Sequence, residues 1–127
     1  MDKTVLIIDN EPEWRERYSA ELEAEGFNVL TAADSREAMS HLENIQFDLI
    51  ISEVEMPLGS GLESLSEFMK IRNDLKLVIT SDHPELKNDF RTWIADAFVT
   101  KSDNLSDLKT TIKDLFIDEE KFSSCLN

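Results

Sequence analysis

Short apolar runs alternate with amphipathic segments along the chain. The runs are continuous rather than interrupted at every second position, and most of their side chains are β-branched or bulky. Such runs are typical of strands that are buried on both faces of a parallel sheet. They occur at fairly even intervals: residues 5–8, 27–30, 49–51, 77–79 and 98–99. The pattern therefore predicts five buried parallel strands.

The segments between these runs have the apolar period of helices and recognisable helix ends. Pro12 suits the first position of a helix that Gly26 would end. Asp34 and Asn104 are suitable caps for two later helices. Apolar stripes at helical spacing lie within residues 14–22, 62–69, 86–93 and 105–115. Strict alternation of strand and helix predicts an α/β fold with a doubly wound, five-stranded parallel sheet and helices on both faces.

Charge and composition narrow the class of partner. The 127 residues suit one domain, and their formal net charge is −14. Nucleic-acid binding needs clustered Lys and Arg, and this sequence has no such cluster. We therefore expect no nucleic-acid binding by this domain. No apolar run approaches the ~20 residues that a membrane helix needs, and no signal peptide is recognisable. We therefore expect no membrane contact and a cytoplasmic location, with cations or basic protein surfaces as partners.

Polar side chains follow the predicted strands. Asp9 and Asn10 come after the first, Glu53 ends the third, Thr80 ends the fourth and Lys101 follows the fifth. Each has an ordinary structural explanation, such as a helix cap, a strand residue or a solvated charge. However, doubly wound sheets place their sites at the carboxyl ends of the strands. The combination predicts a site at that edge.

Four segments carry a resemblance to a known family: VLIIDNEP, DLIISEVEMPLGSGLE, LVITS and AFVTK. In order, spacing and chemistry the chain resembles the receiver domain of two-component response regulators, over roughly residues 3–116. The resemblance implies the flavodoxin-like (βα)5 fold. We expect a receiver domain over residues 1–120 and a short polar tail over residues 121–127.

The resemblance also implies roles for the site residues. Glu53 stands at the position of the aspartate that accepts a phosphoryl group from a histidine kinase. Asp9 and Asn10 match the acidic pair that, with residue 53, holds Mg²⁺. Thr80 and Lys101 match the residues that hold the phosphoryl oxygens.

A further residue of the resemblance is the switch aromatic. Phe98 matches the side chain that turns inward when the family is activated. This change alters a face made by the helix around 86–93, the strand at 98–99 and the helix after Asn104. We expect a signalling protein, for example a histidine kinase, to bind there.

Three substitutions depart from the family pattern. Glu53 carries one methylene more than the usual Asp, and a misplacement of about 1 Å can slow in-line transfer on the order of 10²-fold. Asn10 replaces a carboxylate by an amide, which predicts weak Mg²⁺ binding. Ser102 replaces a proline that is often cis in the family, and a cis bond before Ser would cost about 3 kcal/mol or more, so we expect trans.

Two interpretations of Glu53 stay open at this point. Its carboxylate could reach Lys101 and Thr80 and partly imitate a phosphorylated aspartate, although with one charge instead of about −1.5 to −2. Alternatively, an ion pair between Glu53 and Lys101 fixes one conformation and carries no signal.

The leading functional hypothesis is an atypical receiver domain that acts as a regulatory interaction module, not as an enzyme, without ordinary phosphorylation. The alternative is a working Mg²⁺-dependent phosphoacceptor in a phosphorelay. There Glu53, Thr80 or Ser81 would take the phosphoryl group, although neither hydroxyl has an adjacent His base. A third hypothesis, an unrelated flavodoxin-like enzyme or nucleotide binder, is disfavoured because DNEPEW replaces a Gly-rich loop after the first strand.

Overall fold

A computed structural model describes residues 3–53, 69, 72, 74–85, 95–102 and 104–126, with side chains as far as Ile117. Apart from Met69, the helices expected around 62–69 and 86–93 lie outside this part of the chain. The elements are β1 (Thr4–Ile8), α1 (Pro12–Ala24), β2 (Asn28–Ala32), α2 (Ser35–Asn44), β3 (Leu49–Glu53), β4 (Lys76–Ser81), β5 (Ala97–Thr100) and α4 (Ser106–Leu126). All five predicted strands are confirmed.

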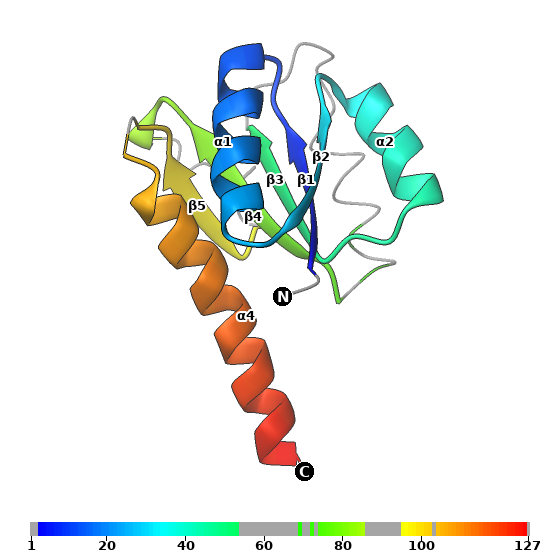
Figure 1. Ribbon diagram of the computed structural model, residues 1–127, viewed down its shortest axis with the longest axis vertical. Coiled ribbons are helices and arrows are strands. Elements are labelled where there is room, and N and C mark those ends of the chain that lie inside the picture. Colours follow the sequence, from blue (N-terminus) through cyan, green and yellow to red (C-terminus); the bar gives the residue numbers. More distant parts are fainter. Residues whose placement is uncertain are drawn as a thin grey trace.

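The strands form one parallel sheet in the order β2-β1-β3-β4-β5 (Figure 1). The order starts at β1 and winds outward in both directions, as a doubly wound sheet requires. Because all strands are parallel, their carboxyl ends lie at one edge. Along this edge Ile8 pairs with Ser52, Glu53 pairs with Thr80, and Ser81 pairs with Thr100.

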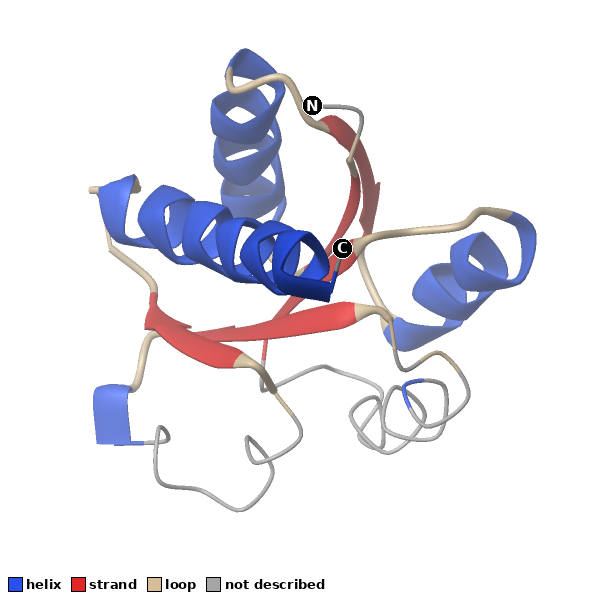
Figure 2. Ribbon diagram, turned by 90° about the horizontal axis from the view of Figure 1, so that it is seen from below, coloured by secondary structure: helices blue, strands red, loops and turns tan. Residues whose placement is uncertain are grey.

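Helices cover both faces of the sheet, and each face has its own apolar core (Figure 2). On one face α2 places Ala38 and Leu42 against Leu6, Ile50 and other strand residues. The core of the other face is made by α1, α4 and the alternate strand residues: Val5, Ile7, Tyr18, Leu22, Phe27, Leu49, Ile51, Val78, Val99, Leu108, Ile112 and Phe116. Full burial of each large apolar side chain contributes about 1.5–3 kcal/mol, so the two cores hold the site's edge in place.

The predicted helix ends are confirmed where they are described. Pro12 begins α1, and Gly26, with a φ of 96°, follows its end. Asp34 Oδ1 accepts a hydrogen bond of 2.9 Å from Glu37 N, while Glu37 Oε2 accepts one of 3.0 Å from Ala33 N. The first bond satisfies a backbone donor that the first turn of α2 leaves free, and the second ties Glu37 to the residue before the N-cap.

Helix α4 continues to Leu126 and extends beyond the sheet (Figure 1). The backbone of residues 121–126, which we expected to form a short polar tail, is therefore helical. The division of the chain at residue 120 stays a prediction. Within the described part of the chain, no helix combines the length and apolarity that a bilayer crossing requires.

Candidate functional site

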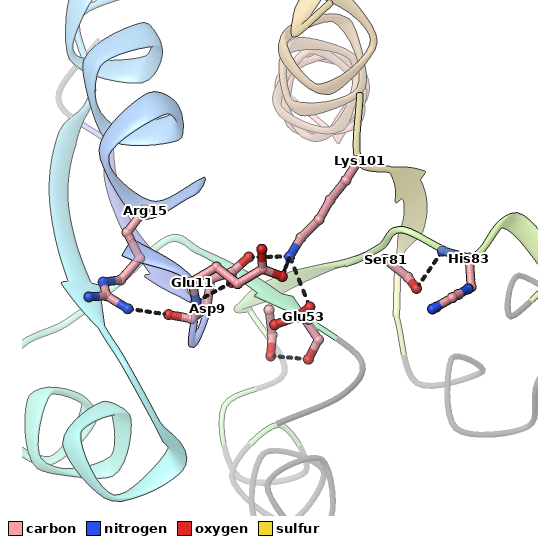
Figure 3. Close-up of polar contacts among 8 residues, drawn as sticks. Asp9, Glu11, Arg15, Glu53, Ser81, His83 and Lys101 are labelled. Atoms are coloured by element: carbon pink, nitrogen blue, oxygen red, sulfur yellow. Dashed lines mark hydrogen bonds and ion pairs between the residues drawn. The ribbon is translucent and has the colours of Figure 1, made fainter. Parts of the chain in front are cut away.

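A buried lysine lies at the centre of the site. Lys101 directly follows β5, and its side chain reaches across the sheet's edge to residues that follow β1 and end β3 (Figure 3). Its Nζ lies 2.7 Å from Asp9 Oδ2, 2.9 Å from Glu53 Oε1 and 3.5 Å from Glu11 Oε1. The Lys101 side chain is fully buried. We call Asp9, Glu11, Glu53 and Lys101 the lysine–carboxylate network.

The backbone turn after β1 fixes the first carboxylate. Asp9 Oδ1 accepts a hydrogen bond of 2.9 Å from Glu11 N, and Asp9 N donates one of 3.1 Å to Ala32 O. From α1, Arg15 Nη1 donates a hydrogen bond of 2.7 Å to the Asp9 carbonyl. The Asp9 side chain is only 2% exposed. Asp9 is therefore held by its own turn and by the neighbouring strand and helix.

Glu53 is a buried carboxylate with only one of its oxygens satisfied. Oε1 accepts the hydrogen bond from Lys101, whereas Oε2 has no hydrogen-bond partner among the described residues. Burial raises the pKa of Glu53 to about 7; the bond from Lys101 opposes this rise, and the Asp9 carboxylate adds to it. Because the neighbouring Asp9 carboxylate disfavours a negative charge on Glu53, a proton competes with Lys101 for Glu53.

The charge of Lys101 is secured by its partners. Burial alone would lower the pKa of the Lys101 ammonium, but the bonds to Asp9 and Glu53 outweigh burial and raise this pKa. The Trp14 ring lies against the ammonium, with its centroid 5.5 Å from Nζ. An ammonium ion is thus the resident cation of this edge, enclosed by carboxylates and an aromatic face.

The other predicted site residues lie around the network. Thr80, paired with Glu53, is 1% exposed, and its Oγ1 has no hydrogen-bond partner in the described structure. Phe98 is half-buried and packs against the core on the α2 face. Asn10 is exposed, so the structure brings Asp9, Glu53 and Lys101 into contact and leaves the Asn10 side chain outside this contact. The expected trans bond between Lys101 and Ser102 is confirmed.

Glu11 is the member of the network that the sequence did not predict. It is the N-cap residue of α1 with an extended backbone, φ −96° and ψ 112°. In an extended segment residues i and i+2 point to the same side, so Glu11 follows Asp9 towards Lys101 while Asn10 points away. This alternation, read from the DNEP segment, was the signal that could have identified Glu11.

The carboxylates of the network match the ligands that Mg²⁺ prefers. Asp9, Glu11 and Glu53 each offer an oxygen, and these oxygens lie within 4.8 Å of one another. Hard carboxylate oxygens suit Mg²⁺, and the unpartnered Glu53 Oε2 could accept a cation. A bound Mg²⁺ would supply positive charge for an incoming anion. Lys101 Nζ already lies within 3.5 Å of one oxygen of each of these three carboxylates, so its positive charge opposes the binding of a second cation there.

The protein's relatives identify the family. A model of the response regulator receiver domain matches residues 5–113. The chain belongs to the response regulator receiver family. The sensor kinase CckA of Brucella abortus is 32% identical over 118 residues, which are 88% of this chain and 12% of that protein. The response regulator RR06 of Streptococcus pneumoniae is 31% identical over 114 residues, which are 87% of this chain and 52% of that protein.

Solved receiver structures match almost end to end. The response regulator TrrA of Thermotoga maritima, solved in complex with Mg²⁺-BeF, is 36% identical with a TM-score of 0.82, covering 89% of this chain and 98% of that chain. A CheY-like receiver of Methanospirillum hungatei is 29% identical with a TM-score of 0.85, covering 95% and 98%. The predicted flavodoxin-like receiver fold is confirmed. By contrast, the chain spans about half or less of the curated relatives described above, so their whole activities do not transfer to it.

Proposed function

We propose that this receiver domain is a regulatory protein-interaction module whose site is held by the lysine–carboxylate network instead of being switched by phosphorylation of residue 53. The observation that carries the proposal is Lys101, which is fully buried and bonded to Glu53 at 2.9 Å and to Asp9 at 2.7 Å. The resemblance assigns this lysine to an incoming phosphoryl group. In this protein, the carboxylates of Asp9 and Glu53 already bind the Lys101 ammonium.

The chemistry of residue 53 supports the same proposal. A Glu carboxylate stands further from the strand than Asp, and phosphoryl transfer depends on placement to about 1 Å. A pKa of about 7 also leaves Glu53 partly protonated near neutral pH, which weakens it as a nucleophile. Both effects act against transfer to Glu53.

The proposed partner is a signalling protein that binds the surface of β5 and α4. A shallow groove of about 380 Å³ there is lined by Phe98, Val99, Thr100, Asp107, Thr110 and Thr111. The structural relative TrrA was also solved in complex with the histidine kinase ThkA, at 36% identity and a TM-score of 0.80. A histidine kinase is therefore one candidate partner. We expect the two proteins to bind in the cytoplasm.

A working Mg²⁺-dependent phosphoacceptor is the second candidate. Two features favour it: three carboxylates that can hold a cation, and a buried Thr80 hydroxyl without a partner in the described structure. In the receiver family, the hydroxyl at this position binds a phosphoryl oxygen.

Incubation with acetyl phosphate and Mg²⁺ separates the two candidates. We expect the intact mass of the native protein to stay unchanged, because Glu53 is displaced and bonded to Lys101. The double variant Asn10→Asp, Glu53→Asp is the positive control, and we expect it to gain a labile phosphoryl group. A labile gain on the native protein that Glu53→Gln abolishes would contradict the proposal.

The Phe98 ring tests whether Glu53 imitates a phosphorylated aspartate. A charged, buried hydrogen bond contributes about 1.5–3 kcal/mol, enough to shift a balanced conformational equilibrium when Glu53→Gln removes its charge. If Glu53 imitates phosphorylation, the variant loosens Phe98, and its ring resonances change in the NMR spectrum. Unchanged ring resonances would leave the Glu53–Lys101 contact as a fixed ion pair without a signalling role.

A further inference from the structure

Three carboxylates lie around the Lys101 ammonium but do not by themselves account for its burial. Asp9 and Glu53 reach it from within, with side chains that are 2% and 9% exposed. Glu11 reaches it from the solvent side, at 3.5 Å, with a side chain that is 44% exposed. The Lys101 side chain is nevertheless fully buried. A further group therefore covers the ammonium on the side of α1.

Trp14, in the first turn of α1, lies against this ammonium. The centroid of its ring is 5.5 Å from Lys101 Nζ. This distance is within the ~6 Å over which the negative face of an aromatic ring attracts a cation. Trp14 is also half-buried against the core made by α1 and α4, so packing alone is the ordinary explanation of its side chain.

Neighbours on α1 hold the Trp14 ring in place. Three residues further on, the Arg17 guanidinium lies over the ring, 4.7 Å from its centroid. Four residues further on, the Tyr18 ring packs against it with centroids 5.4 Å apart and a tilt of 47°. Residues three and four apart share one helix face, so the three side chains form a stack along α1. Tyr18 is 1% exposed and anchors this stack in the core.

We propose that Trp14 is a positioning residue of the lysine–carboxylate network: the face of its indole holds the Lys101 ammonium on Asp9 and Glu53 and keeps water from it. The inference rests on the proposed function, in which Lys101 stays with the protein's own carboxylates. A ring attracts a cation without adding a charge, at an edge that already has three acids around one lysine. Movement of Lys101 towards an incoming anion is thereby disfavoured.

The test is a double-mutant cycle on the full chain, with tetrafluorotryptophan introduced at position 14 alone. Fluorination nearly keeps the size and apolar character of the ring but removes its negative face. We expect it to lower the equilibrium constant of folding about fivefold or more in the native background, and about twofold at most in Lys101→Met. Equal losses in the two backgrounds would overturn the proposal and leave Trp14 as a packing residue.

Arg17 is the control for the second cation on the ring. It also lies over Trp14, so the substitution is repeated in Arg17→Met. We expect a loss of about fivefold or more to remain there, because Lys101 is still present. A loss that disappears in Arg17→Met would assign the attraction to the guanidinium and overturn the proposal. This comparison decides even if Lys101→Met does not fold.

The position of Lys101 itself is followed by the exchange of its ammonium protons with water, measured in ¹H–¹⁵N spectra. We expect the fluorinated ring to speed this exchange about fivefold or more, because the ammonium leaves its cover more often. The Lys109 ammonium, paired with Glu21 at 3.1 Å, is the internal reference and should not change. Unchanged exchange at Lys101 would overturn the proposal. Phosphorylation of the native protein would refute the proposed function, whereas these measurements, made without a phosphodonor, would still decide the role of Trp14.

Discussion

Lys101→Met should be among the most destabilising single substitutions at this edge, with a loss of about 3 kcal/mol in the free energy of unfolding near pH 8. The cost arises because Asp9 and Glu53 are 2% and 9% exposed in their side chains and would lose their buried counter-ion. Methionine keeps most of the length and apolar volume of the lysine stem. Chemical denaturation of both proteins gives the difference directly.

A matched control separates this network from surface ion pairs. Lys113 pairs with Glu25 at 3.0 Å, but both side chains are partly exposed, so Lys113→Met should cost on the order of 0–1 kcal/mol. Equal small losses in Lys101→Met and Lys113→Met would mean that the buried network contributes no more than a surface pair.

The pH dependence of stability should change when Glu53 is replaced by Gln. The folded state raises the pKa of Glu53 to about 7, so the folded protein binds this proton more tightly than the unfolded chain does. The resulting stability is fully present below the unfolded pKa of about 4.5 and is lost as the pH rises through about 7. Its size is on the order of 1–3 kcal/mol, because a shift of one unit corresponds to about 1.4 kcal/mol.

Glutamine has the shape of the protonated side chain but does not titrate. We therefore expect the free energy of unfolding of Glu53→Gln, minus that of the native protein, to rise by on the order of 1–3 kcal/mol as the pH increases from about 5 to about 8. Glu13→Gln, on the exposed face of α1, controls for the loss of a negative charge and should follow the native curve. Parallel curves for the native protein and Glu53→Gln would rule out a raised pKa at this position.

The fold could be predicted because its signals are local. Continuous apolar runs identified the five strands, and caps such as Pro12, Gly26 and Asp34 identified helix ends. The helical backbone of residues 121–126 was not predicted, because the polar composition of that segment suggested a tail. The helices expected around residues 62–69 and 86–93 remain predictions, because apart from Met69 these residues lie outside the described part of the chain.

The site was only partly predictable because it depends on distances between strand ends. The alternation of strands and helices placed Asp9, Glu53, Thr80 and Lys101 at one edge, and the structure confirms that placement. The sequence pattern could not tell whether Glu53 would contact Lys101, Thr80 or both. In the structure Glu53 accepts a hydrogen bond from Lys101, and Thr80 Oγ1 has no partner among the described residues. This arrangement favours the fixed ion pair over a full imitation of a phosphorylated aspartate.

Matching the family motif position by position does not predict that Glu11, rather than Asn10, contacts Lys101. A match by position assigns Asn10 to the metal, because that is where the family has its second acid. The backbone instead turns at Asp9, whose carboxylate accepts a hydrogen bond from Glu11 N, and Glu11 is extended at the start of α1. The direction of a side chain within a short turn depends on these angles, which the motif alone does not encode.

The most direct test of the central claim is a comparison of ¹H–¹⁵N spectra of the native protein in Mg²⁺ alone and in Mg²⁺ with beryllofluoride, an analogue of the phosphoryl group. The lysine–carboxylate network predicts that beryllofluoride leaves the resonances of Thr80, Phe98 and Lys101 where Mg²⁺ alone places them. The Asn10→Asp, Glu53→Asp variant should respond under the same conditions. Saturable shifts of these resonances in the native protein would contradict the account, because they would mean that Lys101 and Thr80 are free to hold a phosphoryl group beside Glu53.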